Sequence, residues 1–130
     1  MGAIFVAYGE RDHRTDVLEF AVEQAMSGGR DLVVYHVRED KSESVLEIRE
    51  EIEFAVRKKD PSLVYDIEID RLKDRSKREL LLEAVFETDR DFDYVVMGEI
   101  KRGPLEGITH SSLTKAILNE HSIPVMLVPL

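Results

Sequence analysis

Five short apolar segments recur along the chain, and their pattern predicts five β-strands. The segments at residues 3–8, 32–37, 94–98 and 125–128 are nearly continuous hydrophobic runs. Such runs are typical of strands that are buried on both faces of a parallel sheet. The segment at residues 63–69 differs, because Tyr65, Ile67 and Ile69 alternate with acidic residues. This alternation indicates a strand with one solvated face, at an edge of the sheet.

Helical periodicity occupies the intervals between the strands. Apolar residues at positions 17, 20, 21 and 25 predict a first helix that ends at Gly28, with an N-cap at Asp12 or Thr15. Three further helices are expected at residues 42–59, 80–87 and 113–118. The second carries a narrow apolar stripe on a charged surface and ends before Pro61, and Ser76 is the expected cap of the third.

The regular alternation of strands and helices predicts the fold class. An α/β domain spanning residues 1–130 is expected, with a five-stranded parallel, doubly wound sheet and helices on both faces. The expected strand order is 3-2-1-4-5, which places the third and fifth strands at the two edges. A chain of 130 residues fits one domain with one core.

Composition narrows the classes of partner. The net charge of −9, from 27 acidic and 18 basic residues, disfavours nucleic acid. No apolar segment approaches the roughly 20 residues of a membrane span, and the N-terminus lacks the basic region of a signal peptide, so a cytoplasmic location is expected. The absence of cysteine excludes disulfides and thiolate metal sites.

His36 lies in a buried strand and is expected to be a core residue.

The topology predicts where a ligand would bind. In a doubly wound sheet, ligands bind beyond the carboxyl ends of the strands, here at the loops after the first, second and fourth strands. The longest loop spans residues 98–112 and leads to the N-terminus of the expected fourth helix, which attracts anions. Ser111 and Ser112 could bind phosphate there or could simply cap the helix. Pro104 occupies the place of the lysine in a P-loop, and no nucleophile elbow is present, so a metabolic enzyme is disfavoured.

These features together resemble the universal stress protein family over essentially the whole chain. The resemblance rests on the element order, on "YHV" closing the second strand, on the glycine after the fourth strand and on "HSIPVMLVP" near the C-terminus. It implies a small regulatory or protective protein of stress adaptation. It also implies a homodimer formed through the strand at residues 125–128, because an apolar edge strand is a pairing site.

The nucleotide-binding branch of that family has a loop of Gly, two residues, Gly, nine residues, then Gly-Ser or Gly-Thr. Counted from Gly98, the second glycine position holds Lys101, and the final pair is Ser111 and Ser112. The span is therefore kept while two glycines are replaced, so the ATP-binding motif is degenerate. Lys101 and the adjacent Arg102 could replace backbone contacts to phosphate, or could be charges of a solvated loop.

The first strand also departs from the family pattern. Nucleotide-binding members usually carry an acidic residue just before a glycine at its end, where this chain has Tyr8 before Gly9. Tyr8 could stack on a base, or it could fill the adenine space, whereas Val37 matches the family's adenine-side position. The candidate ligand-binding residues are Gly9, Val37, Gly98, Lys101, Arg102, Ser111 and Ser112.

The sequence motifs leave two functions open. The preferred one is a stress protein with weak or no ATP binding, acting through its dimer or a protein partner. The alternative is an ATP-binding stress protein or switch with an altered phosphate loop and at most slow hydrolysis.

Overall fold

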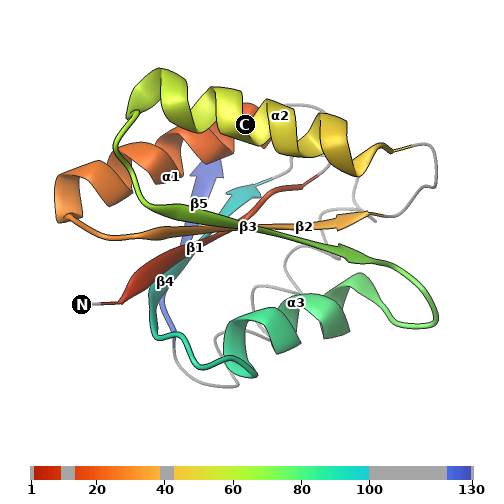
Figure 1. The fold of residues 1–130 in the computed structure, drawn as a ribbon. Helices are drawn as coiled ribbons and strands as arrows, with labels where there is room; N and C mark the ends of the chain where they lie inside the picture. Colours follow the sequence, from red (N-terminus) through yellow and green to blue (C-terminus); the bar gives the residue numbers. More distant parts are fainter. Residues whose placement is uncertain (1, 10–13, 39–42, 100–122, 130) are drawn as a thin grey trace.

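The computed structural model describes residues 2–9, 14–38, 43–99 and 123–129, and within them five parallel strands form one sheet. The strands are β1 (Ala3–Ala7), β2 (Leu32–Arg38), β3 (Tyr65–Arg71), β4 (Phe92–Glu99) and β5 (Val125–Pro129). Their order across the sheet is β3-β2-β1-β4-β5 (Figure 1). This confirms the predicted parallel sheet and places β3 and β5 at its edges.

Helices cover both faces of the sheet, as predicted. The described helices are α1 (Arg14–Gly28), α2 (Val45–Lys59) and α3 (Lys77–Phe86). Helices α1 and α2 lie side by side on one face, and α3 covers the opposite face (Figure 1). The helix predicted at residues 113–118 lies outside the described residues.

The sheet separates the core into two layers. Ile4 and Val6 of β1 pack on the side of α1 and α2, whereas Phe5 between them packs on the side of α3. All three side chains are fully buried. Because successive side chains of a strand point to opposite faces, burial on both faces requires the continuous apolar run seen in the sequence.

Strand β3 has the one-sided character that its alternating sequence predicts. Tyr65, Ile67 and Ile69 are half-buried, while the acidic residues between them are exposed. The strand runs from residue 65 to 71 and not from 63 to 69. It begins later because a turn at Asp60 continues to Leu63, whose backbone N–H donates to the Asp60 carbonyl at 3.3 Å. It ends later because pairing with β2 continues to its last residue.

Capping groups determine where the helices begin and end. Thr15 lies inside α1, so it is not the N-cap, and Asp12 is outside the described residues. Gly29 follows α1 with a φ of 63°, which confirms the predicted stop, since glycine adopts this backbone conformation without a steric penalty. Helix α2 begins at residue 45, not 42, because the Ser44 hydroxyl accepts the Glu47 backbone N–H at 3.3 Å.

The cap of α3 is the one predicted. The Ser76 hydroxyl accepts the Glu79 backbone N–H at 3.1 Å, and the helix begins at Lys77. The apolar pattern alone placed the start at residue 80, because the first turn is polar and faces water. A periodic pattern detects only the turns that touch the core.

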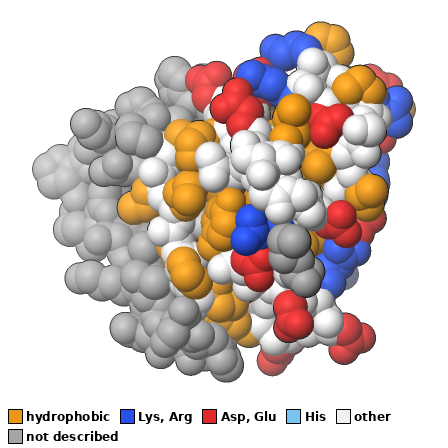
Figure 2. Space-filling view, turned by 90° about the vertical axis from the view of Figure 1, so that its left-hand side faces the viewer, with side chains coloured by type: hydrophobic (Ala, Val, Ile, Leu, Met, Phe, Trp, Pro, Cys, Tyr) orange, Lys and Arg blue, Asp and Glu red, His pale blue; other side chains and the backbone are white. Residues whose placement is uncertain are grey.

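The surface combines apolar and charged regions. Figure 2 shows the side on which the N-terminus lies, where hydrophobic side chains gather beside charged ones. Among the described residues, no helix is long and apolar enough to cross a membrane.

Candidate functional site

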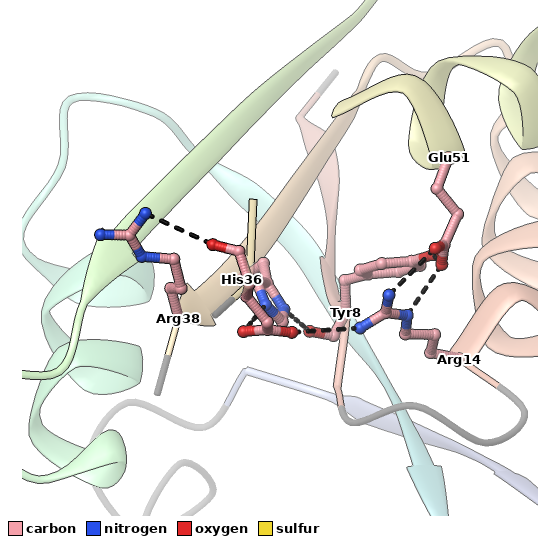
Figure 3. Close-up of polar contacts among 6 residues, drawn as sticks. Tyr8, Arg14, His36, Arg38 and Glu51 are labelled. Atoms are coloured by element: carbon pink, nitrogen blue, oxygen red, sulfur yellow. Dashed lines mark hydrogen bonds and ion pairs between the residues drawn. The ribbon is translucent and has the colours of Figure 1, made fainter. Parts of the chain in front are cut away.

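The candidate site lies at the carboxyl ends of β1 and β2, beneath the N-terminal halves of α1 and α2. Strand β1 is central, with β2 on one side and β4 on the other, so the strand order reverses between β1 and β4. Ligands of doubly wound sheets bind outside this reversal point. Figure 3 shows the polar side chains that meet there.

Three of the predicted binding residues fall within the described residues. Gly9 is half-buried, and a Cβ built on it would meet no atom of the described residues within 4 Å. Val37 is 5% exposed and packs in the core layer on the α3 side. Gly98 lies within β4, paired with Val128 of β5. The other four, Lys101, Arg102, Ser111 and Ser112, lie outside the described residues.

Tyr8 occupies the center of the described site. It follows β1, continues the pairing by donating its backbone N–H to the Tyr35 carbonyl at 2.8 Å, and is only 2% exposed. Its hydroxyl donates to a carboxylate oxygen of Glu51 on α2 (Figure 3). Burial, and then the hydrogen bond to Glu51, raise the pKa of the Tyr8 hydroxyl, so the phenol stays neutral and remains a donor.

Two side chains contact the Tyr8 ring. The Arg14 guanidinium lies over the ring, with its central carbon 4.9 Å from the ring centroid, in a cation–π arrangement. The His36 ring packs with its centroid 5.9 Å away at an interplanar angle of 69°. Because Tyr8 is only 2% exposed, its ring lies within the core and presents almost no surface for stacking on a base.

Arg14 connects the two helices that cover the site. Its Nε and Nη2 donate to the two carboxylate oxygens of Glu51 at 2.8 and 3.0 Å, a bidentate pairing (Figure 3). Its Nη1 lies 3.6 Å from a carboxylate oxygen of Glu43. The hydrogen bond from Arg14, more than that from Tyr8, holds the pKa of Glu51 below its usual range, although burial acts in the opposite direction. The positive charge of Arg14 is thus largely engaged by carboxylates.

His36 links β1 to the segment before α2. Its Nδ1 lies 2.8 Å from the Tyr8 carbonyl oxygen, and its Nε2 lies 3.3 Å from a Glu43 carboxylate oxygen. A carbonyl and a carboxylate both accept hydrogen bonds, so only the doubly protonated ring can donate to both. His36 is 4% exposed, which confirms that it is a buried residue with hydrogen-bond partners.

The sequence patterns did not identify Arg14, Glu43 or Glu51 as members of the site. They are separated from Tyr8 by up to 43 residues and belong to no local motif. One signal was present, because Glu51 directly precedes the buried Ile52 and so borders the apolar stripe of α2. A carboxylate at the border of a buried stripe can turn toward the core when a cation is available there.

Similar proteins are found among solved structures, whereas none of the curated proteins compared matches the chain. Among solved structures, a universal stress protein in complex with cAMP is 14% identical, with a TM-score of 0.72 over 99% of this chain and 98% of that one.

Two structures from Archaeoglobus fulgidus have the same fold. A universal stress protein is 19% identical, with a TM-score of 0.66 and 98% coverage of both chains. A universal stress protein in complex with dAMP is 21% identical, with a TM-score of 0.64 over 98% of this chain and 97% of that one. At these identities the likeness shows the fold.

Family membership follows from the sequence match. The model of the universal stress protein family matches residues 1–129, nearly the full length of the chain. This match agrees with the sheet order and with the neighbouring structures. The chain therefore belongs to the universal stress protein family.

Proposed function

We propose that this protein is a regulatory or protective stress protein that acts as a homodimer and binds ATP weakly or not at all. A cytoplasmic location belongs to the same proposal. The observation that carries it is the burial of Tyr8 against Arg14 and His36, with its hydroxyl donating to Glu51. By the family resemblance, nucleotide-binding members carry an acidic residue at this position. In this chain the position holds Tyr8, whose ring would fill the adenine space.

The energy of moving Tyr8 supports weak binding. A ligand that displaced the ring would break its hydrogen bond to a carboxylate, which contributes about 1.5 kcal/mol, and its cation–π contact, which contributes about 0.5 kcal/mol. These are lower-range values because Glu51 is partly in water. A cost of about 2 kcal/mol weakens binding roughly thirtyfold. The replacement of two loop glycines by Lys101 and Ser111 acts in the same direction.

We expect isothermal titration calorimetry with ATP and Mg²⁺ to give no saturable heat up to about 1 mM, where a ligand gains only about 4 kcal/mol on binding. A thermal-shift measurement at the same ligand concentration should leave the melting temperature unchanged, since only ligands that bind the folded state raise it. ATP co-purifying with the protein would contradict this expectation.

The second candidate is an ATP-binding stress protein with an altered phosphate loop and slow hydrolysis. One observation favours it: Arg14 Nη1 is buried and has no hydrogen-bond acceptor among the described residues. A ligand oxygen could accept that N–H. The related structures with cAMP and dAMP are consistent with an adenine nucleotide in this fold. The calorimetric titration distinguishes the two candidates directly.

The dimer is proposed from the exposed edge of β5. Within the described part of the chain, β5 pairs only with β4, and Leu127 is 43% exposed. Exposed edge strands with apolar side chains pair readily with another strand. Two copies of β5 side by side, antiparallel around a two-fold axis, would form one continuous sheet.

Light scattering after size exclusion should therefore give twice the chain mass of 14.9 kDa at about 50 µM protein. Leu127→Lys should shift the population toward monomer, because it places a charge at the paired edge. Met26→Lys is a matched control, since Met26 is 45% exposed on α1, and it should leave the mass unchanged. A monomeric wild-type protein would exclude this dimer.

A further inference from the structure

A groove of about 580 Å³ lies between α1 and α2, on the outer surface of the helical layer. Its described walls come from the first half of α1 and from most of α2, and among these lining residues Glu51 also belongs to the Tyr8 site. Phe54 contributes to one wall and is 71% exposed. A phenylalanine this exposed makes little contribution to the core, so packing within the chain does not explain its presence.

The exposed apolar residues of α2 form a row. Leu46 is 66% exposed and lies two turns before Phe54, with Glu50 midway between them on the same helical face. Eight residues of helix span about 12 Å along the axis. The row therefore continues the apolar wall of the groove to a length that suits a peptide segment better than a small molecule.

The groove is also negatively charged. Glu19 is paired with Lys58 at 3.1 Å, and Glu51 is paired with Arg14. Among the described residues, Glu47 and Glu50 form no ion pair, so two carboxylates beside Phe54 remain uncompensated. Glu47 lies in the first turn of α2, where the helix dipole favours an acidic side chain. That local explanation does not extend to Glu50.

We propose that this groove binds a basic, amphipathic helical segment of a partner protein. Its apolar side chains would cover Phe54 and Leu46, and its lysines or arginines would pair with Glu47 and Glu50. The negative charge disfavours an anionic lipid surface or a phosphate ligand. It also disfavours pairing with the same groove of a second copy, because the two grooves would bring like charges together.

The test uses fluorescence anisotropy with a labelled 14-residue peptide of leucine and lysine, with leucines at helical spacing. At about 150 mM salt the wild-type protein should bind it with a Kd of roughly 10–100 µM, since the helix would be held by a few apolar anchors and ion pairs. Phe54→Ala and Glu50→Lys should each raise the Kd by about tenfold, because they remove the apolar anchor and reverse an uncompensated charge.

Two matched variants control for non-specific effects. Val64→Ala removes an apolar side chain that is 65% exposed before β3, and Asp89→Lys reverses a charge on an exposed loop, both outside the groove. Each should change the Kd by less than about twofold, as expected for surface substitutions without partners. An equal loss of binding in Asp89→Lys, or no binding to the wild-type protein, would overturn the proposal. A lower mass of Phe54→Ala in light scattering would instead assign the groove to a second copy and overturn it as well.

Discussion

Replacing Tyr8 with alanine is expected to lower the free energy of unfolding by about 3–5 kcal/mol, the range for deleting a buried aromatic ring. The ring is 2% exposed and packs in the core layer beneath α1 and α2. Its removal would leave a cavity and would also take away the contacts to Arg14 and His36. Urea denaturation followed by circular dichroism, at one fixed protein concentration, measures the change.

Tyr8→Phe separates the ring from its hydroxyl. This variant keeps the packing and loses the hydrogen bond to Glu51, so a loss of about 1–2 kcal/mol is expected. Phe54→Ala provides the exposed control, since its aromatic ring contacts mainly water, and a change within about 0.5 kcal/mol is expected. A loss below 1 kcal/mol in Tyr8→Ala would show that the ring is not part of the core.

Replacing Glu51 with alanine is expected to lower the free energy of unfolding by about 1–2 kcal/mol at pH 7. The substitution leaves Arg14, whose side chain is 11% exposed, without its bidentate partner, and Tyr8 without an acceptor for its hydroxyl. The expected loss is smaller than for a fully buried pair, because the Glu51 side chain is 37% exposed. Glu50→Ala changes a neighbouring glutamate that lacks an ion pair among the described residues, and it should have little effect.

The contribution of Glu51 to the free energy of unfolding should depend on pH in a defined direction. Because the hydrogen bond from Arg14 lowers the pKa of Glu51 in the folded protein, the carboxylate stabilises the fold at any pH above the pKa of the unfolded chain, about 4.3. This stabilisation is lost as the pH falls through the lower pKa of the folded state. The difference between wild type and Glu51→Ala should therefore be constant from pH 7 to about 5 and should shrink below about 4. A difference that grows in acid would contradict the assigned pairing.

The two substitutions also probe the proposed function. Tyr8, Arg14 and Glu51 form one connected group, so their effects on stability should not add. A group that contributes to folding stability in this way has a structural role at the carboxyl ends of the central strands. This agrees with the proposal of weak or absent ATP binding, and ATP titration of Tyr8→Phe provides the comparison with the ring still in place.

Much of the fold could be predicted because buried strands and helices require apolar residues at regular spacings in the sequence. The continuous apolar runs of β1 and β2 reflect burial on both faces, and the alternation in β3 reflects an edge strand with one solvated face. Element boundaries were less predictable. They depend on hydrogen bonds such as Ser44 to the Glu47 backbone and on the extent of strand pairing, neither of which has a periodic signal.

The site was only partly predictable. The topology predicts it at the carboxyl ends of the central strands, and the family pattern drew attention to Tyr8; the ligand-binding role of this place stays a prediction. The family pattern left open whether the tyrosine stacks on a base or fills the space. That choice depends on Arg14 and Glu51, which approach Tyr8 only when α1 and α2 pack together.

The sequence by itself determined the alternation of strands and helices, the parallel sheet and the family, because each is recorded in local spacing or in a pattern that covers the whole chain. Only the tertiary structure decided what surrounds Tyr8. No local pattern indicates which side chains that are distant in the sequence will pair. Their pairing arises from the way two helices pack on one face of the sheet. The same packing brings Glu51 to Arg14 and leaves Phe54 exposed beside the groove.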